Sequence, residues 1–264
     1  DKTVGELTRK DAEKLLGTVL DIGESMLICG GEVSRVEDTM QRICTSYGVA
    51  RVNPFVITSS IVITLQLTDG DAVTQTRRIN RSATDFTGLE ELNELSRYLC
   101  SHTPPVDEIA AIYKESIQQK EQTKRAAKML FGYLIAACAF AIFFGGNMWD
   151  GCAAALIAVA IWFLDLYFRK IVPSQMMYLL FAAFIMGTLA MSFKFTGLPF
   201  HADKIMIGDI MLLIPGLLMT NAVRDIFSGD TISGMLRLCE SLLMAGMIAA
   251  GTVAAIFLMG GIKG

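Results

Sequence analysis

Hydrophobic residues dominate the second half of the chain in long stretches, each close to the length of a membrane-spanning helix. Such a helix needs about 20 mainly apolar residues to cross the hydrocarbon core of a bilayer. The fourth stretch contains Asp209 and Pro215-Gly216, which predicts a kinked span. The predicted spans cover approximately residues 129–149, 151–168, 172–193, 205–223 and 236–262. The pattern therefore predicts an integral membrane protein with an all-α, five-span transmembrane domain over residues 126–264.

The first half of the chain has shorter periods, which are typical of a water-soluble domain. Apolar residues first recur every three or four positions, then alternate with polar ones, and then return to the helical period. The predicted elements are helices over 16–27 and 33–43, strands over 52–58, 61–67 and 72–76, and helices over 85–100 and after Pro104-Pro105. Ser82 and Asp85 have the spacing of a capping box before the third helix. We expect a small cytoplasmic α+β domain over residues 1–125 that ends in an amphipathic helix.

Charge is distributed as this division requires. The chain has 264 residues, 53% of them hydrophobic and 19% charged, with a mean hydropathy of +0.48. Residues 1–128 hold 35 of the 49 Lys, Arg, Asp and Glu residues. A single soluble globule would carry about 25% charge, spread along its length. The asymmetry excludes that class and favours a soluble domain fused to a membrane domain.

The positions of Lys and Arg predict the orientation in the cell membrane. Short cytoplasmic loops carry an excess of these residues. With five spans, eight of them fall on the side of the N-terminus and three on the other. The eight are Lys120, Lys124, Arg125, Lys128, Arg169, Lys170, Arg224 and Arg237, and the three are Lys194, Lys204 and Lys263. We therefore expect a cytoplasmic N-terminus and an external C-terminus.

Several classes of site are not indicated. The net charge of −3 gives no reason to expect nucleic acid. The six cysteines are scattered, and His102 and His201 are the only histidines, so we expect neither a metal site nor a disulfide framework. The charged, amphipathic start predicts no signal peptide. Neither a phosphate loop nor a nucleophile–base pair is recognisable, and we expect no cofactor and no catalytic residue.

Polar residues gather around the fourth span, where they are the candidate site. Charged residues within or beside spans are expensive and tend to mark transport pathways or buried pairs. A Pro-Gly break at membrane depth exposes backbone groups that can hold ions or substrate carboxylates. The candidate substrate-binding or coupling residues are Asp209, Pro215, Gly216, Asn221, Arg224, Asp225, Asp230, Arg237 and Glu240. The alternative interpretation is an ordinary cytoplasmic loop with a surface ion pair between Arg237 and Glu240.

Among these residues, the sequence suggests different roles. Asp209 is the only acid several residues inside an otherwise apolar span, so it is the leading candidate to exchange a proton. Asp225 and Glu240 are the next candidates. Arg224 and Asn221 are suited to a substrate carboxylate.

Three separated motifs resemble the threonine/serine exporter family. The run PGLLMTNAVRDIFSGDTISGMLRLCES resembles the family signature, CGGEVSRVEDTMQRIC resembles its glycine–glutamate–arginine pattern, and FFGGNMWDGCAAALI resembles its Gly-Gly–Asp loop. The resemblance covers nearly the whole chain. Asp209 lies just before the signature, so the resemblance supports it less than Asn221, Arg224 and Asp225.

The resemblance implies half of a secondary exporter. It is closest to the family's split form, in which a five-span subunit with a cytoplasmic domain works with a small hydrophobic membrane subunit, as in the two-subunit succinate exporter. The family exports threonine and serine, or a dicarboxylate such as succinate, driven by the proton-motive force. An odd number of spans agrees with one half of an inverted repeat. The alternatives are a ligand-sensing scaffold or regulatory membrane subunit, and a membrane-anchored enzyme.

Overall fold

The computed structural model describes residues 7–80, 85–118, 122–169, 171–172 and 174–261. Of the residues used in the predictions above, Ser82, Lys120, Lys170 and Lys263 lie outside these ranges. The chain forms two compact units. The first consists of Asp1–Lys120 and Leu217–Leu238, and the second of Glu121–Gly216 and Cys239–Gly264. The expected boundary at residue 125 separates a cytoplasmic domain from a transmembrane domain, which is a different division from that into compact units. It stays a prediction.

The first unit begins with two helices, a sheet and two more helices, in the predicted order. The helices are α1 (Arg9–Ile28), α2 (Val33–Ser46), α3 (Phe86–His102) and α4 (Val106–Gln118), and the strands are β1 (Arg51–Ile57), β2 (Ser60–Gln66) and β3 (Ala72–Arg78). The antiparallel sheet has the order β1-β2-β3. The predicted hairpin turn joins β2 to β3, where Gly70 has a φ of +91°. Asp85 is itself the N-cap of α3 and accepts the N–H of Gly88, whereas the predicted capping box placed Ser82, which lies outside the described residues, at the cap.

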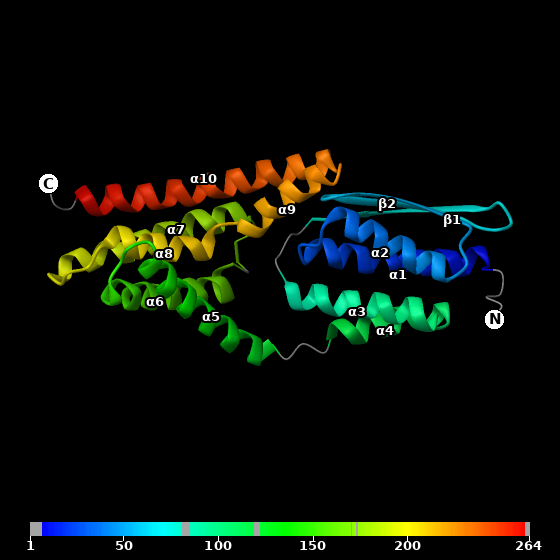
Figure 1. Cartoon of the computed structure of the whole chain (residues 1–264), viewed down its shortest axis with the longest axis horizontal. Coiled ribbons are helices and arrows are strands. Elements are labelled where there is room, and N and C mark those ends of the chain that lie inside the picture. The colour runs from blue at the N-terminus through cyan, green and yellow to red at the C-terminus, as the bar shows by residue number, and fades with distance from the viewer. Residues whose placement is uncertain (1–6, 81–84, 119–121, 170, 173, 262–264) are drawn as a thin grey trace. The chain divides into compact units, whose positions relative to one another are not determined.

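These elements form layers, with α1 and α2 between the sheet and the pair α3–α4 (Figure 1). The predicted apolar face of α1 is buried, as is the inward face of β2 with Ile61, Ile63 and Leu65. The helices lie close together because Gly23 of α1 faces Met40 of α2, where a Cβ would lie 2.7 Å from the sulfur.

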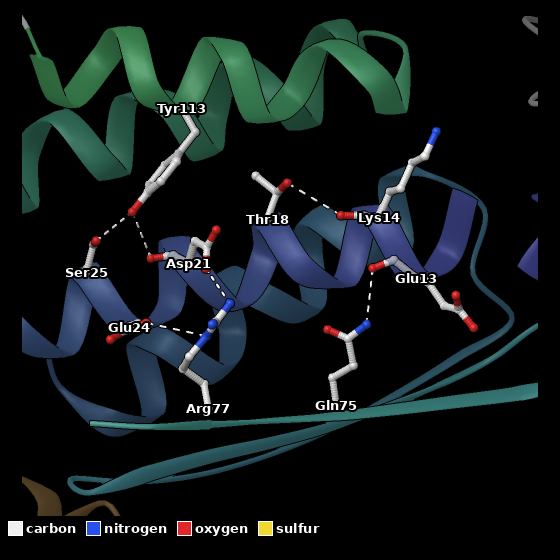
Figure 2. A network of polar contacts seen from close by, with 9 residues as sticks. All are labelled: Glu13, Lys14, Thr18, Asp21, Glu24, Ser25, Gln75, Arg77 and Tyr113. Atoms are coloured by element: carbon white, nitrogen blue, oxygen red, sulfur yellow. Dashed lines mark hydrogen bonds and ion pairs between the residues drawn. The ribbon is translucent and has the colours of Figure 1, made fainter. Parts of the chain in front are cut away.

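Polar contacts on α1 fasten the layers on both sides (Figure 2). From β3, Arg77 pairs with Asp21 and with Glu24, the latter at 3.4 Å between Nε and Oε2. From α4, the hydroxyl of Tyr113 contacts Ser25 at 2.8 Å and donates to the carbonyl of Asp21 at 3.1 Å. The middle helix is therefore fixed to both neighbouring layers by side chains that remain partly accessible to water.

In the part that the structure describes, the second unit consists of helices joined by short turns and loops. It contains α5 (Gln122–Phe143), α6 (Met148–Phe163) with the π-helical turn η1 (Leu164–Phe168), α7 (Gln175–Ser192) with the 3-10 turn η2 (Phe193–Thr196), α8 (Ala202–Leu213) and the later part of α10 (Thr231–Gly261). The helix α5 ends before the expected residue 149, because Gly145 adopts a φ of +92° and Asn147 caps α6. The fourth stretch is broken where predicted: α8 ends at Leu213, and α9 (Gly216–Phe227) begins after Pro215.

Within the described residues, three helical segments are long and apolar enough to cross a membrane, or four if α8 and α9 form one broken span. The three are Met148–Phe168, Gln175–Thr196 and Thr231–Gly260. Residues Ala127–Phe143 form a shorter apolar helix. The chain is thus mostly helical, with several apolar helices and one small sheet, as a membrane protein with a soluble part would be. The count of five spans stays a prediction.

Close packing of α8 on α5 depends on Gly208. A Cβ at this position would lie 2.7 Å from the carbonyl oxygen of Ala137 and 2.9 Å from the Cβ of Ala141. We expect Gly208→Ala to lower the free energy of unfolding by about 1–3 kcal/mol, the usual cost of overpacking. Gly132→Ala on α5 is the matched control, because a Cβ there meets nothing within 4 Å. The control should be neutral or stabilising by about 0.5–1 kcal/mol. Equal thermal unfolding of the two variants in detergent would contradict this packing.

Candidate functional site

The signature residues form a helical hairpin in the first unit. Its arms are α9 and the first turns of α10, which lie side by side (Figure 1). The turn between them needs Gly229, whose φ is +95°. The arms approach closely at Gly234, where a Cβ would lie 2.8 Å from the carbonyl oxygen of Ala222.

A buried ion pair joins the two arms. Asp225 of α9 is 1% exposed and Arg237 of α10 is 5% exposed. The Nη1 of Arg237 lies 3.1 Å from the Oδ2 of Asp225. Arg237 is therefore not the surface residue that the alternative interpretation assumes, because its guanidinium is buried against Asp225. Glu240 itself lies further along α10, in the second unit.

The hairpin is fastened to the loop between α1 and α2. The amide of Asn221 donates to the carbonyl of Gly30 at 2.9 Å, and Nη2 of Arg237 donates to the carbonyl of Gly31 at 2.8 Å. Arg224 forms an ion pair with Glu32. These contacts cross about 190 to 206 residues of sequence. We call this cluster the loop clasp; it consists of Gly30, Gly31, Glu32, Asn221, Arg224, Asp225 and Arg237.

The loop clasp also caps α2. The N-cap residue Glu32 makes no side-chain hydrogen bond to its own helix. Instead the carboxylate of Asp225 accepts the backbone N–H of Val33, at the helix N-terminus. A carboxylate is favoured there because the first N–H groups are unpaired and the helix dipole is positive at that end. Asp225 thus has an arginine on one side and a helix end on the other.

The α1–α2 loop has the shape that these contacts need because of its glycines. Gly30 has a φ of +91°, and a Cβ on Gly31 would lie 2.8 Å from the carbonyl oxygen of Met26. The helix α1 ends with hydrogen bonds from both glycine N–H groups to its last turn. The two carbonyls are then left for Asn221 and Arg237. Both motifs are recognisable in the sequence, but nothing in it indicates that they meet.

Asp209 lies apart from the loop clasp, in the second unit. It is completely buried in α8, a helix that packs against α5, α6 and α7. Neither carboxylate oxygen has a hydrogen-bond partner in the part of the chain that the structure describes. A buried carboxylate without a partner is costly when ionised. Such a group is suited to holding a proton or to meeting a cation.

The second unit contains one further buried acid that the candidate set missed. Asp150 is completely buried and accepts the N–H of Asn147 at 2.9 Å and that of His201 at 2.8 Å. Its other contact is Nδ1 of His201, at 3.0 Å. The carboxylate thus ties the α5–α6 turn to the segment before α8. The spacing Asn-x-x-Asp in the Gly-Gly–Asp motif signals the cap, but the histidine 51 residues away could not be foreseen.

The remaining predicted site residues are placed as follows. Pro215 and Gly216 form the break between α8 and α9. Asp230 follows the hairpin turn, and its N–H donates to the carbonyl of Asp225 at 2.9 Å. In the described ranges, no group of three or more His, Cys, Asp or Glu residues is arranged to hold a metal ion.

Glu37 connects α2 to the sheet edge and should give the stability a pH dependence. Its Oε1 accepts the N–H of Val56 at 2.9 Å. Burial raises the pKa of Glu37 above its ordinary 4.5, the Val56 N–H offsets part of the rise, and Asp230 adds to it. The folded state therefore binds this proton more tightly than the unfolded state does. The contribution of protonated Glu37 to the free energy of unfolding is full below pH 4.5 and is lost as the pH rises through the pKa of the folded state.

We accordingly expect Glu37→Gln to flatten the fall of melting temperature from pH 4.5 to 7. Glutamine retains an oxygen acceptor for Val56 but does not titrate. Glu94→Gln on the exposed side of α3 is the control, and it should leave the slope unchanged. The same slope in wild type and Glu37→Gln would show that this carboxyl does not set the pH dependence.

Comparison with known proteins supplies the biological context. The ThrE family model, which describes a threonine/serine exporter, matches residues 17–259. A probable succinate transporter subunit, YjjP of Escherichia coli K12, is 25% identical over 91% of this chain and 93% of its own length. The threonine/serine exporter of Corynebacterium glutamicum is 24% identical over 87% of this chain, but over only 48% of its own length. A probable threonine/serine exporter of Mycobacterium tuberculosis is 23% identical over 95% of this chain and 47% of its own length. No solved structure matches the chain.

Proposed function

Because this chain belongs to the threonine/serine exporter family, we propose that it is one subunit of a secondary exporter of small polar metabolites. The family is one of transporters, so the chain is not an enzyme. Relatives of this chain are named for succinate or for threonine and serine. These substrates are small and carry a carboxylate. The proposed substrate class is therefore hydroxy-amino acids or a dicarboxylate.

The observation that carries the proposal is the buried, unpartnered carboxylate of Asp209 next to a broken helix. With 12 residues, α8 is about 18 Å long at the helical rise. This is too short to cross a core of about 30 Å, so the break after Leu213 falls within the membrane. A carboxyl group at this depth can take up a proton in one state and release it in another. We propose that Asp209 couples export to the proton-motive force in this way.

The loop clasp has a different role in this proposal. Its polar groups already bind other residues of the same chain, so we do not assign them to substrate binding. They hold the hairpin that follows the break, and thus anchor one end of the broken span to the first unit. Asn221, Arg224, Asp225 and Arg237 are positioning residues, and the backbone freed at Pro215-Gly216 is the proposed place for a substrate carboxylate.

The proposed topology has five spans, formed by α5, α6, α7, the α8–α9 pair as far as about residue 223, and α10 from about residue 236. Residues 1–125 are then cytoplasmic, residues 126–264 form the transmembrane domain, and the C-terminus lies outside the cell membrane. The distribution of Lys and Arg supports this orientation. In a cysteine-free background, a cysteine placed at Phe227 should not react with an impermeant maleimide added to intact cells. Reaction from outside would refute this orientation.

The partner in this proposal is a small hydrophobic membrane subunit that supplies the second half of the transporter. Two observations support it: YjjP is named a subunit, and the two exporters are about twice as long as their matched part. We expect vesicles containing both subunits to export labelled threonine, serine or succinate under a proton gradient. Vesicles with either subunit alone should be inactive. Full export by this chain alone, or no export of any of the three by the pair, would contradict the proposal.

A further inference from the structure

We infer that the exposed apolar face of the α9–α10 hairpin is the docking surface for the second membrane subunit. This inference rests on the proposed function, since it assumes a transporter completed by another chain. The face is defined by large hydrophobic residues that are 40–86% exposed. They are Leu217, Met219, Val223, Phe227, Ile232, Met235 and Leu236.

The other sides of the hairpin are occupied by contacts within the chain. The inner sides of the two arms close on each other around Gly234. The polar side of α9 is held by the loop clasp through Asn221, Arg224 and Asp225. The remaining side of α9 has no cover in the described chain and ends in Phe227, which is 86% exposed. This apolar surface is not covered by any of the residues that the structure describes.

The rest of the described surface of the first unit does not have this character. Outside the hairpin, its exposed large hydrophobic residues are Phe55, Phe86 and Tyr98, each on a different element or end of the layers. Single exposed residues of this kind are common on soluble proteins, whereas a contiguous apolar patch marks an interaction surface.

A protein partner fits this face better than acyl chains do. The end of α9 lies against the loop between α1 and α2, where Arg224 pairs with Glu32, and Asp230 stands in the turn of the hairpin. Placing Phe227 and Ile232 in the hydrocarbon core would therefore bring these charges with them, at high cost. An open depression of about 520 Å³ on the same face is lined by Thr220, Val223, Arg224, Phe227 and Ser228. Its mixture of aromatic, aliphatic and hydrogen-bonding groups, with an arginine, is typical of protein interfaces.

The identity of the occupant follows from the relatives. YjjP of similar length is named a subunit, while in the two exporters about half of the length lies outside the part matched by this chain. A second half must then be contributed either by the same chain or by a partner. We assign the face to that complementary half rather than to a second copy of this chain.

Photocrosslinking of the full chain, co-expressed with a small hydrophobic membrane subunit of the same family, tests the assignment. A benzophenone amino acid replaces Phe227 in one variant and Phe55, which is 58% exposed on β1, in the control. We expect an adduct with the small subunit at position 227, in at least about tenfold greater yield than at position 55. An adduct with lipid alone, a dimer of this chain, equal yields at the two positions, or no adduct would overturn the inference.

A second measurement separates docking from folding and from transport. Phe227→Glu should reduce the co-purified small subunit at least about tenfold, while Phe55→Glu should not, and both should melt like wild type in detergent. Unreduced co-purification with Phe227→Glu would overturn the docking surface. Failure of the wild-type pair to export any tested substrate, with the crosslink intact, would contradict the proposed function and leave the interface standing.

Discussion

The Asp209→Asn variant should reduce the rate of proton-driven export by about 100-fold or more. This is the lower end of the loss that is usual when a proton-transferring group is removed. Asparagine has nearly the shape of the carboxylic acid but cannot release a proton. The fold should survive, because the wild-type carboxylate makes no hydrogen bond within the described chain that the change would break. The melting temperature in detergent should stay the same or rise, since a buried ionisable group is removed. Efflux from vesicles with both subunits, measured at several values of pH, checks the prediction.

Asp203→Asn is the matched control for this variant. Asp203 lies in the first turn of the same helix, its side chain is 67% exposed, and it forms an ion pair with Lys204 at 3.5 Å. It should transport at the wild-type rate. Counterflow exchange without a proton gradient distinguishes a loss of proton coupling from a loss of substrate transport itself. A variant that has lost only coupling still exchanges substrate. Wild-type rates and pH dependence in Asp209→Asn would place the coupling group elsewhere.

Much of the fold of the first unit was predictable from the sequence, because the information that specifies it is local. The period of apolar residues in α1 and the alternation in β2 each state which side of the element is buried. The turn before β3 depends on residues within four positions of each other. The break after Leu213 was likewise predictable, since proline removes the helical hydrogen bond wherever it stands.

The candidate site was predictable only in part, because its contacts are not local. Asn221, Arg224 and Arg237 were identified as polar residues beside a span, but their partners Gly30, Gly31 and Glu32 lie about 190 to 206 residues away. No periodicity connects two loops at that separation. Residue type alone also cannot distinguish Asp225, which is paired, from Asp209, which is not. Burial and partners made that distinction.

The largest expected effect on stability comes from Arg237→Met. The change leaves the carboxylate of Asp225 buried at 1% exposure without its cation, and it removes the hydrogen bond to Gly31. Removing one member of a buried ion pair costs about 3–5 kcal/mol. Thermal or denaturant unfolding of the full chain in detergent measures the loss. Arg42→Met is the control, because its i,i+4 pair with Asp38 has a 72% exposed arginine and a 55% exposed aspartate and should contribute less than about 1 kcal/mol.

The double variant Asp225→Asn with Arg237→Met distinguishes a buried charge from a lost contact. If the cost of Arg237→Met arises mainly from the uncompensated carboxylate, removing that charge as well should restore more than half of the lost stability. If the hydrogen bonds of the loop clasp dominate, the double variant should be as unstable as the single one. In that case its export should fall together with its melting temperature, because the hairpin after the broken span would no longer be held. If Arg237→Met is no less stable than Arg42→Met, the buried pair does not hold the hairpin in place.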